Sequence, residues 1–269
     1  PSRQGDLDAL TLEKARRAKA AREAKPHWSR MSQAVAKGNA VQRKVDKAQA
    51  KLTAAEAAAK ETHAAGVASV FGPLRDRLRD LIAEIGASSR TPDARLDSLT
   101  LPRDQQMAFC LEVAEKIGFD ATRGRLDVST HPFCGGSHCD DVRMTTRFHD
   151  DMLTDAVSST MHESGHAMYE QGLPYAAFGA PCGDSVSLGI HESQSRMWEN
   201  QVGRSESFWK FAAPLLEKHF GATVAGIDAR AAFESANRVN PGFIRVEADE
   251  ATYNMHIMIR FGLERAMLT

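Results

Sequence analysis

The feature that most constrains the fold is the pentapeptide His162-Glu163-Ser164-Gly165-His166, which places two histidines four residues apart. On an α-helix, residues four apart lie on the same face, so both imidazoles can reach one ion. Glu163 follows the first histidine and can lie beside a metal-bound water without ligating the metal, where a general base must sit. The pattern therefore predicts a helix with the zinc site of a metallopeptidase. Apolar flanks and a terminal glycine support this helix: Leu153, Val157, Met161, Met168 and Gly172.

A catalytic zinc needs a third protein ligand and an open fourth position. Glu170 lies on the same helix as the two histidines, and three ligands along one straight helix cannot surround an ion. A second helix is expected over residues 189–200, and its Glu192 is the best candidate. Glu199, two turns further on, is the rival, while His191 would give a different type of zinc site. The competing interpretation is two surface histidines that bind nothing.

The overall composition is that of an ordinary globular protein, with 269 residues, 42% of them hydrophobic and 26% charged. No apolar run approaches the roughly 20 residues that cross a membrane, and the N-terminus lacks the apolar core of a secretory signal. Four cysteines in a chain of this length are too few for a disulfide framework. We therefore expect a reduced, cytoplasmic protein that does not bind membranes.

Charge is distributed unevenly, because residues 1–62 contain 14 Lys/Arg and 7 Asp/Glu, whereas the rest contains 20 and 28. We interpret residues 1–65 as a basic, Ala-rich helical segment and residues 66–269 as the domain with the metal site. Nucleic-acid binding is not expected, because this basic segment has no aromatic residue other than Trp28. A short apolar stripe at heptad-like spacing predicts a thin helical seam: Val41, Val45, Ala48, Leu52, Ala55 and Ala59.

The remaining patterns predict a mainly helical fold. Proline and glycine signals predict helices over residues 73–86 and 102–118. Alternation of apolar and polar residues in Leu126–Val128 and Val142–Met144 predicts a short β ribbon, with Gly135–Gly136 in its turn region.

Three arginines could each hold a substrate carboxylate through two parallel hydrogen bonds. Taken alone, any one of them is more often a structural ion-pair partner. Asp141, Asp184 and Asp249 could orient these arginines or the ligand histidines. The three arginines are Arg143, Arg147 and Arg245.

A second cluster of metal-ligating residue types is formed by Cys134, His138 and Cys139. No further Cys/His pair lies nearby to complete a tetrahedral site. We therefore expect ordinary loop thiols here.

Five motifs, in order and at similar spacing, resemble the carboxypeptidase Taq family. They are His131-Pro132-Phe133, Asp141-Val142-Arg143-Met144-Thr145, His162–His166, His191-Glu192-Ser193-Gln194 and Ile244–Asp249. The resemblance covers roughly residues 66–269 and is weak before residue 100. Residues 1–63 show no motif that matches the family. It implies a mostly helical zincin-type fold with a deep cleft and a small β element beside the metal. It also implies a metallocarboxypeptidase that removes single C-terminal residues with broad specificity and commonly forms homodimers.

The resemblance further implies roles for individual residues. In three groups, these are the metal ligands His162, His166 and Glu192; the base Glu163; and the substrate-binding candidates Arg245, Arg143 and His131. The implied cofactor is zinc, with cobalt as a substitute. The implied partner is a peptide with a free C-terminus.

Family members are considerably longer and carry a further motif near their C-terminus that does not occur before Thr269. We therefore expect an incomplete member that binds zinc but is a poor or inactive peptidase by itself. Two alternatives remain from the residues alone: a zinc oligopeptidase or aminopeptidase, and a truncated, non-catalytic helical protein that keeps the metal site. The intact Glu163 argues against the second.

Overall fold

The computed structural model describes residues 61–268, together with residues 14, 16, 19, 43, 44, 46, 47 and 49–54. The chain divides into two compact units, Pro1–Pro73 and Leu74–Thr269. The apolar stripe predicted over residues 41–59 lies largely outside the described residues, and its one described member, Leu52, is helical and exposed. The division predicted after residue 65 stays a prediction.

Residues 61–87 are helical, so the helix predicted over residues 73–86 begins earlier than expected. Pro73 lies inside this helix and not at its first position. Proline removes one backbone hydrogen bond, whose acceptor would be the carbonyl of Ser69 four residues before it. Ser69 is exposed, so water can satisfy that carbonyl and the helix continues through the proline.

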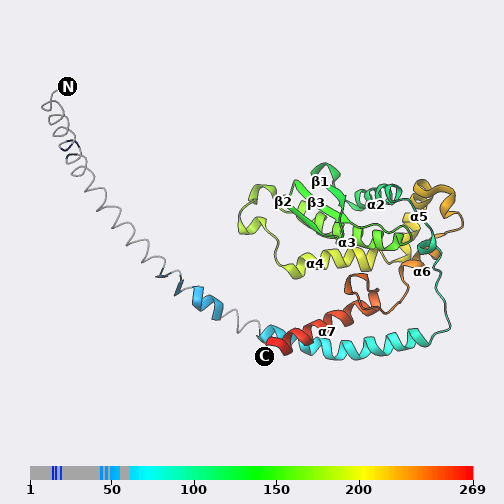
Figure 1. The fold of residues 1–269 in the computed structure, drawn as a ribbon, viewed down its shortest axis with the longest axis horizontal. Coiled ribbons are helices and arrows are strands. Elements are labelled where there is room, and N and C mark those ends of the chain that lie inside the picture. The colour runs from blue at the N-terminus through cyan, green and yellow to red at the C-terminus, as the bar shows by residue number, and fades with distance from the viewer. Residues whose placement is uncertain are drawn as a thin grey trace, which may run out of the picture. The chain divides into compact units, whose positions relative to one another are not determined.

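The long helix α3 (Leu153–Gln171) is the centre of the unit Leu74–Thr269, and it contacts α2 (Arg103–Ile117) and α6 (Ala229–Ala236) (Figure 1). The helix α5 (Glu206–Phe220) packs against α2 and α6. The α2 helix confirms the second predicted helix, and it ends at Gly118, whose φ of 123° few other residues adopt. The largest fully buried side chains of this core include Trp209, Phe109, Leu96, Met161 and Leu216.

A three-stranded sheet, in the order β1-β3-β2, packs on α3 and replaces the predicted ribbon. The strands β1 (Gly124–Val128) and β3 (Asp141–Thr146) pair in parallel, and β2 (Cys134–His138) pairs with β3 antiparallel. The predicted turn at Gly135–Gly136 is therefore wrong, because both glycines lie in β2. A Cβ on Gly136 would come within 2.3 Å of the Asp141 carbonyl oxygen, so this glycine permits close strand approach and not a turn.

The second half of the unit is again helical. After two 3-10 turns come α4 (Leu188–Arg196) and a π-helical segment, Met197–Val202. The chain ends with α7 (Glu250–Leu268), preceded by the 3-10 turn Arg245–Glu247. The predicted fold class, mainly helical with a small β element, is confirmed.

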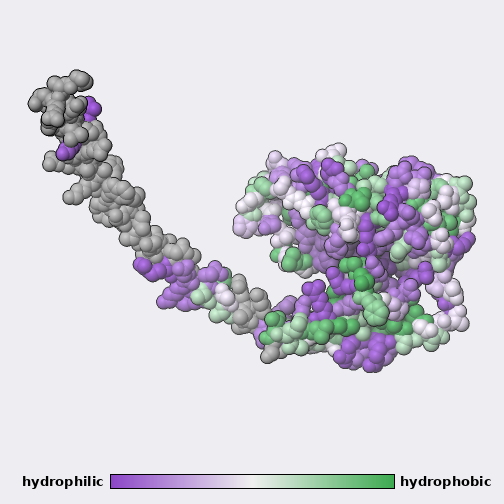
Figure 2. All heavy atoms as spheres, viewed as in Figure 1, coloured by the Kyte–Doolittle hydropathy of each residue, from purple (hydrophilic) through white to green (hydrophobic). Residues whose placement is uncertain are grey.

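Hydrophilic and hydrophobic residues are mixed over the visible face of residues 74–268 (Figure 2). None of the described helices has the length and apolar character needed to cross a bilayer.

Candidate metal centre

The α3 helix presents His162 and His166 on one face, with ring centroids 5.0 Å apart. The opposite side of this helix is anchored in the core by Val157, Met161 and Ala167, which are buried. Both histidines are largely shielded, with 20% and 16% of their side-chain surface exposed. The apolar spacing of the sequence thus fixes which face of α3 carries the histidines.

Gly165 allows α4 to approach this face closely. A Cβ at position 165 would lie 2.6 Å from Ser195 Cα and 2.7 Å from the Gln194 carbonyl oxygen, distances that real side chains do not show. The α4 helix is started by Ser187, whose Oγ accepts a hydrogen bond from the Ile190 amide. The glycine between the two histidines therefore determines how near the next helix can come.

Glu192 of α4 completes a group of three with the histidines. Its Oε2 lies 3.2 Å from His166 Nε2 and 3.8 Å from His162 Nε2. The ligand atoms of the three residues all lie within 4.8 Å of one another. Atoms bound at about 2.1 Å to one tetrahedral ion are spaced by similar distances, so these residues fit a divalent metal such as zinc.

Glu199 contacts the other side of His162. Its Oε2 lies 2.9 Å from His162 Nδ1, and it also accepts hydrogen bonds from Arg196 (2.8 Å) and Ser158 (3.1 Å). A carboxylate on Nδ1 keeps Nε2 free to face Glu192, which is the usual way in which metal-binding histidines are oriented. The structure thus places Glu192, and not its rival Glu199, beside both Nε2 atoms.

The pKa values of His162, Glu192 and Glu199 are shifted toward the charged forms by the opposite charges around them. Burial alone would lower the pKa of His162, but the hydrogen bond to Glu199 and the surrounding carboxylates raise it above its usual value. Burial opposes ionisation of Glu192 and Glu199, yet the pKa of both is lowered, mainly by His166 for Glu192 and by His162 for Glu199. The site thus favours charged carboxylates facing imidazoles.

Glu163 lies in the same cavity and is 5% exposed. Burial raises the pKa of its carboxyl group, opposed by the neighbouring histidines. It does not belong to the group of three ligand atoms around Glu192. Glu163 therefore lies in the cavity of the centre without belonging to its group of candidate ligands.

The residues of this centre line a cavity of about 770 Å³. Arg245, Arg147 and His131, three residues that the sequence proposed as substrate contacts, line it. Arg147 is held by Asp155 through two hydrogen bonds of 2.9 and 3.0 Å, whereas Arg245 donates to Tyr253 Oη at 2.7 Å. The cavity is large enough for a short peptide end.

Arg143 is not among the lining residues of this cavity. Its guanidinium pairs with Asp141 on the exposed side of β3. Asp249 caps the start of α7 by accepting hydrogen bonds from the Ala251 and Thr252 amides. The Nδ1 atoms of His162 and His166 are therefore contacted by groups other than the predicted aspartates.

Sequence reasoning missed two residues of the cavity that link its parts. Arg196 stacks over the Tyr253 ring at 4.1 Å and donates to Glu199. The same Tyr253 hydroxyl accepts from Arg245. The spacing of three between Arg196 and Glu199 on one helix was a usable signal for their ion pair, but nothing in the sequence placed Tyr253 beside them.

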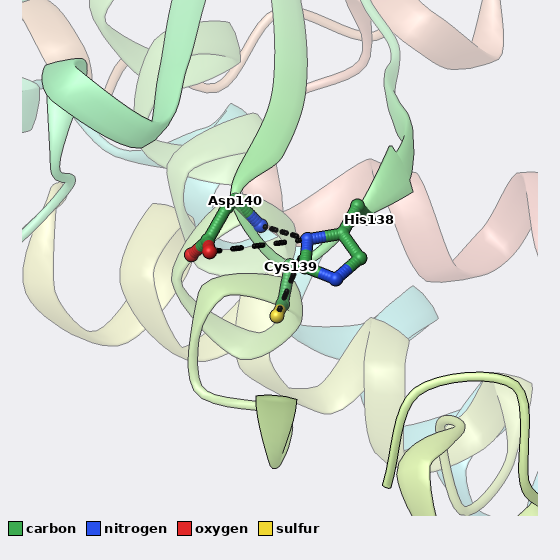
Figure 3. Close-up of side chains that lie close together, drawn as sticks. All are labelled: His138, Cys139 and Asp140. Carbon is green, nitrogen blue, oxygen red and sulfur yellow. Dashed lines mark hydrogen bonds and ion pairs between the residues drawn. The ribbon is translucent and has the colours of Figure 1, made fainter. Parts of the chain in front are cut away.

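A second group of metal-ligating types, His138, Cys139 and Asp140, lies at the end of β2 (Figure 3). Here His138 Nδ1 already accepts the Asp140 amide at 3.0 Å, and Asp140 pairs with Arg123 at 2.5 Å. The guanidinium beside this group disfavours a cation. Cys134, which the sequence grouped with these residues, instead lines the main cavity, where burial raises the pKa of its thiol to about 12.

Comparison with known proteins gives consistent matches. A family model described as Carboxypeptidase Taq (M32) metallopeptidase matches residues 9–269. Thermostable carboxypeptidase 1 of Thermus thermophilus is 43% identical over 198 residues, which cover 74% of this chain and 39% of that protein. Carboxypeptidase 1 of Bacillus subtilis is 36% identical over 200 residues, covering 74% of this chain and 40% of that protein.

Solved structures agree. The M32 carboxypeptidase from Deinococcus radiodurans R1 matches with a TM-score of 0.70 at 43% identity, over 75% of this chain and 40% of that one. A carboxypeptidase from Pyrococcus furiosus matches with a TM-score of 0.69 at 39% identity, over 74% of this chain and 40% of that one. The chain thus spans about two fifths of the length of these relatives.

Proposed function

Because the chain belongs to the carboxypeptidase Taq (M32) family of metallopeptidases, we propose that it is a metal-dependent carboxypeptidase that hydrolyses the C-terminal peptide bond of peptides with broad specificity. One observation carries this proposal. His162, His166 and Glu192 meet in a cavity where Glu163 is buried beside them. Relatives with 36–43% identity are named carboxypeptidases.

One divalent metal, zinc or in its place cobalt, would be held by the two histidines and Glu192. When bound, it supplies a Lewis acid that polarises the scissile carbonyl and lowers the pKa of a water molecule. Three protein ligands leave one position of a tetrahedral site for water and substrate. Two nitrogens and one carboxylate are a common ligand set of catalytic zinc in peptidases, which supports zinc over magnesium or calcium.

Glu163 is proposed as the general base. Its carboxylate takes a proton from the attacking water and later delivers it to the amine nitrogen of the leaving residue. Its position directly after His162 on α3 supports this role, because the side chain reaches the cavity without joining the ligand group. Burial keeps the surrounding water away from this proton.

Arg245 is proposed to bind the terminal carboxylate of the substrate. Within the part of the chain that the structure describes, no carboxylate pairs with Arg245, so its charge in the cavity is not neutralised by an acidic side chain. Arg147 is the second choice, because Asp155 already occupies the Nε/Nη2 edge of its guanidinium. His131 lines the same cavity and is proposed as a further substrate contact.

The test compares two peptides under conditions in which the protein is in excess, so that slow hydrolysis is detected. An N-acetylated dipeptide with a free C-terminus should be cleaved with zinc and not after chelation, and its C-amidated form should resist. Cleavage of the amidated peptide, or a need for a free N-terminus, would point to an oligopeptidase or aminopeptidase. Zinc binding without hydrolysis of any peptide would favour a non-catalytic protein and contradict the proposal.

Two properties stay predictions. One is homodimer formation by the full-length form, which the family resemblance implies, and the other is a cytoplasmic location, which the cysteine content and the lack of a secretory signal indicate. Peptides are the proposed partners, and we predict that neither nucleic acids nor membranes are bound. Sedimentation of the purified chain would test the first of these properties.

A further inference from the structure

A third histidine lies directly behind His166, outside the group of proposed metal ligands. His191 of α4 places its Nδ1 2.5 Å from His166 Nδ1 and its Nε2 2.6 Å from Glu170 Oε1. Only 16% of the His191 side-chain surface is exposed. Both ring nitrogens of His191 are therefore engaged by groups of α3, one on each side.

His166, His191 and Glu170 form a row joined by hydrogen bonds, and the proton positions in this row follow from the proposed metal site. His166 Nε2 faces Glu192 Oε2 at 3.2 Å, so binding a cation there requires an unprotonated Nε2. The proton of a neutral His166 then sits on Nδ1 and is donated to His191 Nδ1, 2.5 Å away. His191 must in turn carry its proton on Nε2, which is donated to Glu170.

We propose that His191 and Glu170 are positioning residues that fix the tautomer and ring orientation of His166 through this row of two hydrogen bonds. The inference rests on the proposed metal centre and adds residues to it. Hydrogen-bonded partners of this kind raise the basicity of a ligand imidazole and hold its ring in place. Neither His191 nor Glu170 is then a ligand, although the sequence left His191 open as one.

The surroundings of His191 favour one orientation of its ring. His166 lies against it with ring centroids 4.7 Å apart at 39°, and Tyr169 meets it edge-on at 4.9 Å. The Tyr169 hydroxyl is engaged elsewhere, because it accepts the Val186 amide at 3.2 Å. The ring of His191 is thus held between α3 side chains, while Tyr169 takes no part in the row of protons.

This arrangement differs from that of His162, which receives a carboxylate directly. Glu199 on the π-helical segment reaches His162 Nδ1 at 2.9 Å, whereas Glu170 needs the interposed imidazole to reach His166. Glu170 follows His166 by one helical turn, and α4 supplies the imidazole between them. Each of the two proposed ligand histidines is thereby linked to a carboxylate. His162 is linked through one hydrogen bond, and His166 is linked through two.

The first test measures Zn²⁺ affinity of the full chain by competition with a chelating dye. His191→Ala and Glu170→Ala should each lower the affinity about 10- to 100-fold, the usual effect of removing such partners. His191→Asn should recover most of this loss, because its Oδ1 stands near the position of Nδ1 and can accept from His166. Glu170→Gln should also retain most of the affinity, because its amide oxygen still accepts the Nε2 proton.

The matched control is Tyr169→Phe, which keeps the ring against His191 and removes only the hydroxyl. Its Zn²⁺ affinity should equal that of the unchanged chain. Thermal unfolding of each variant without metal separates loss of affinity from loss of folding. If His191→Ala fails to fold, the Zn²⁺ affinities of Glu170→Ala, Glu170→Gln and His191→Asn still test the proposed positioning role.

The second test reads the protons directly, by ¹⁵N-histidine NMR of the zinc-loaded chain. His191 should show a protonated Nε2 and an unprotonated Nδ1, and His166 a protonated Nδ1. The opposite tautomer of His191, or unchanged affinity in both alanine variants, would overturn the inference while leaving the metal centre intact. Absence of Zn²⁺ binding by the unchanged chain would instead overturn the proposed function on which the inference rests.

Discussion

The metal centre and the region around Arg245 line the same cavity, but they are held in different ways. At the metal centre, α3 and α4 meet through Gly165 and the fully buried Ser195, with no room for another atom. Around Arg245, the neighbouring Ile244 and Val246 are 53% and 39% exposed. The buried residues of α7, which supplies Tyr253, are Thr252 and Met258.

The two parts of the cavity are therefore held rigid by different interactions. The metal ligands are placed by close packing, which tolerates little displacement. Arg245 is placed by polar contacts with Tyr253, at one end of a row that continues through Arg196 to Glu199. We therefore expect metal affinity to depend on the α3–α4 contact, and substrate binding to depend on Arg245, with little exchange between the two.

The largest expected effect is the loss of Zn²⁺ affinity caused by Glu192→Ala. Because Glu192 lies beside both Nε2 atoms, its loss removes one of three ligands. Glu199→Ala removes only the partner of Nδ1 and should cost about 10- to 100-fold in affinity. Dye competition with Zn²⁺ should rank Glu192→Ala well below Glu199→Ala, and the reverse ranking would give the ligand role to Glu199.

Next in size is the loss of hydrolysis in Glu163→Gln. A general base contributes about 10²- to 10⁴-fold to rate, and the amide cannot accept the proton. Zinc stoichiometry should stay at that of the unchanged chain, because Glu163 is not in the ligand group. Metal analysis together with release of the C-terminal residue from a blocked dipeptide checks this. Hydrolysis near the original rate would exclude Glu163 as the base.

A smaller effect, on hydrolysis and not on metal binding, is expected in the region around Arg245 from Arg245→Ala. Loss of a charge-assisted contact should cost about 1.5–3 kcal/mol in kcat/KM for free-acid peptides. Zn²⁺ affinity should not change, and Arg245→Lys should restore only part, because an ammonium cannot form the fork. Arg143→Lys is the control, since Arg143 pairs with Asp141 away from the cavity. An unchanged kcat/KM in Arg245→Ala would move the role to Arg147.

The smallest effect is expected on stability, from Gly165→Ala. The new Cβ would overlap Ser195 Cα and the Gln194 carbonyl, which should cost roughly 1–3 kcal/mol in free energy of unfolding. Gly262→Ala is a matched control, because Gly262 also lies in a helix, α7, and a Cβ there meets nothing within 4 Å. Urea unfolding of both variants without metal makes the comparison. Equal stability would mean that α4 can move away from α3 freely and that the close packing does not hold the centre.

Local signals in the sequence predicted the parts of the molecule that depend on neighbours along the chain. The spacing of His162 and His166, and the proline and glycine that bound α2, are such signals. Glu192 was favoured because one helix cannot surround an ion, and α4 does bring it to the two histidines. These cases need only helix geometry.

What the sequence could not predict depends on contacts between distant segments. The parallel pairing of β1 with β3 leaves no local pattern, so Gly136 looked like a turn residue. The roles of Gly165, His191 and Tyr253 likewise appear only when α4 and α7 are in place. Pro73 misled for another reason, since an exposed helix tolerates the loss of one hydrogen bond.

The most direct test of the central claim is anomalous diffraction at the zinc edge from crystals of the zinc-loaded chain. We expect one strong peak about 2.0–2.2 Å from His162 Nε2, His166 Nε2 and a Glu192 oxygen. Glu199 should remain on His162 Nδ1 and outside bonding distance of the metal. A peak at His138, Cys139 and Asp140 with none between α3 and α4, or a peak bound by Glu199 in place of Glu192, would contradict this claim.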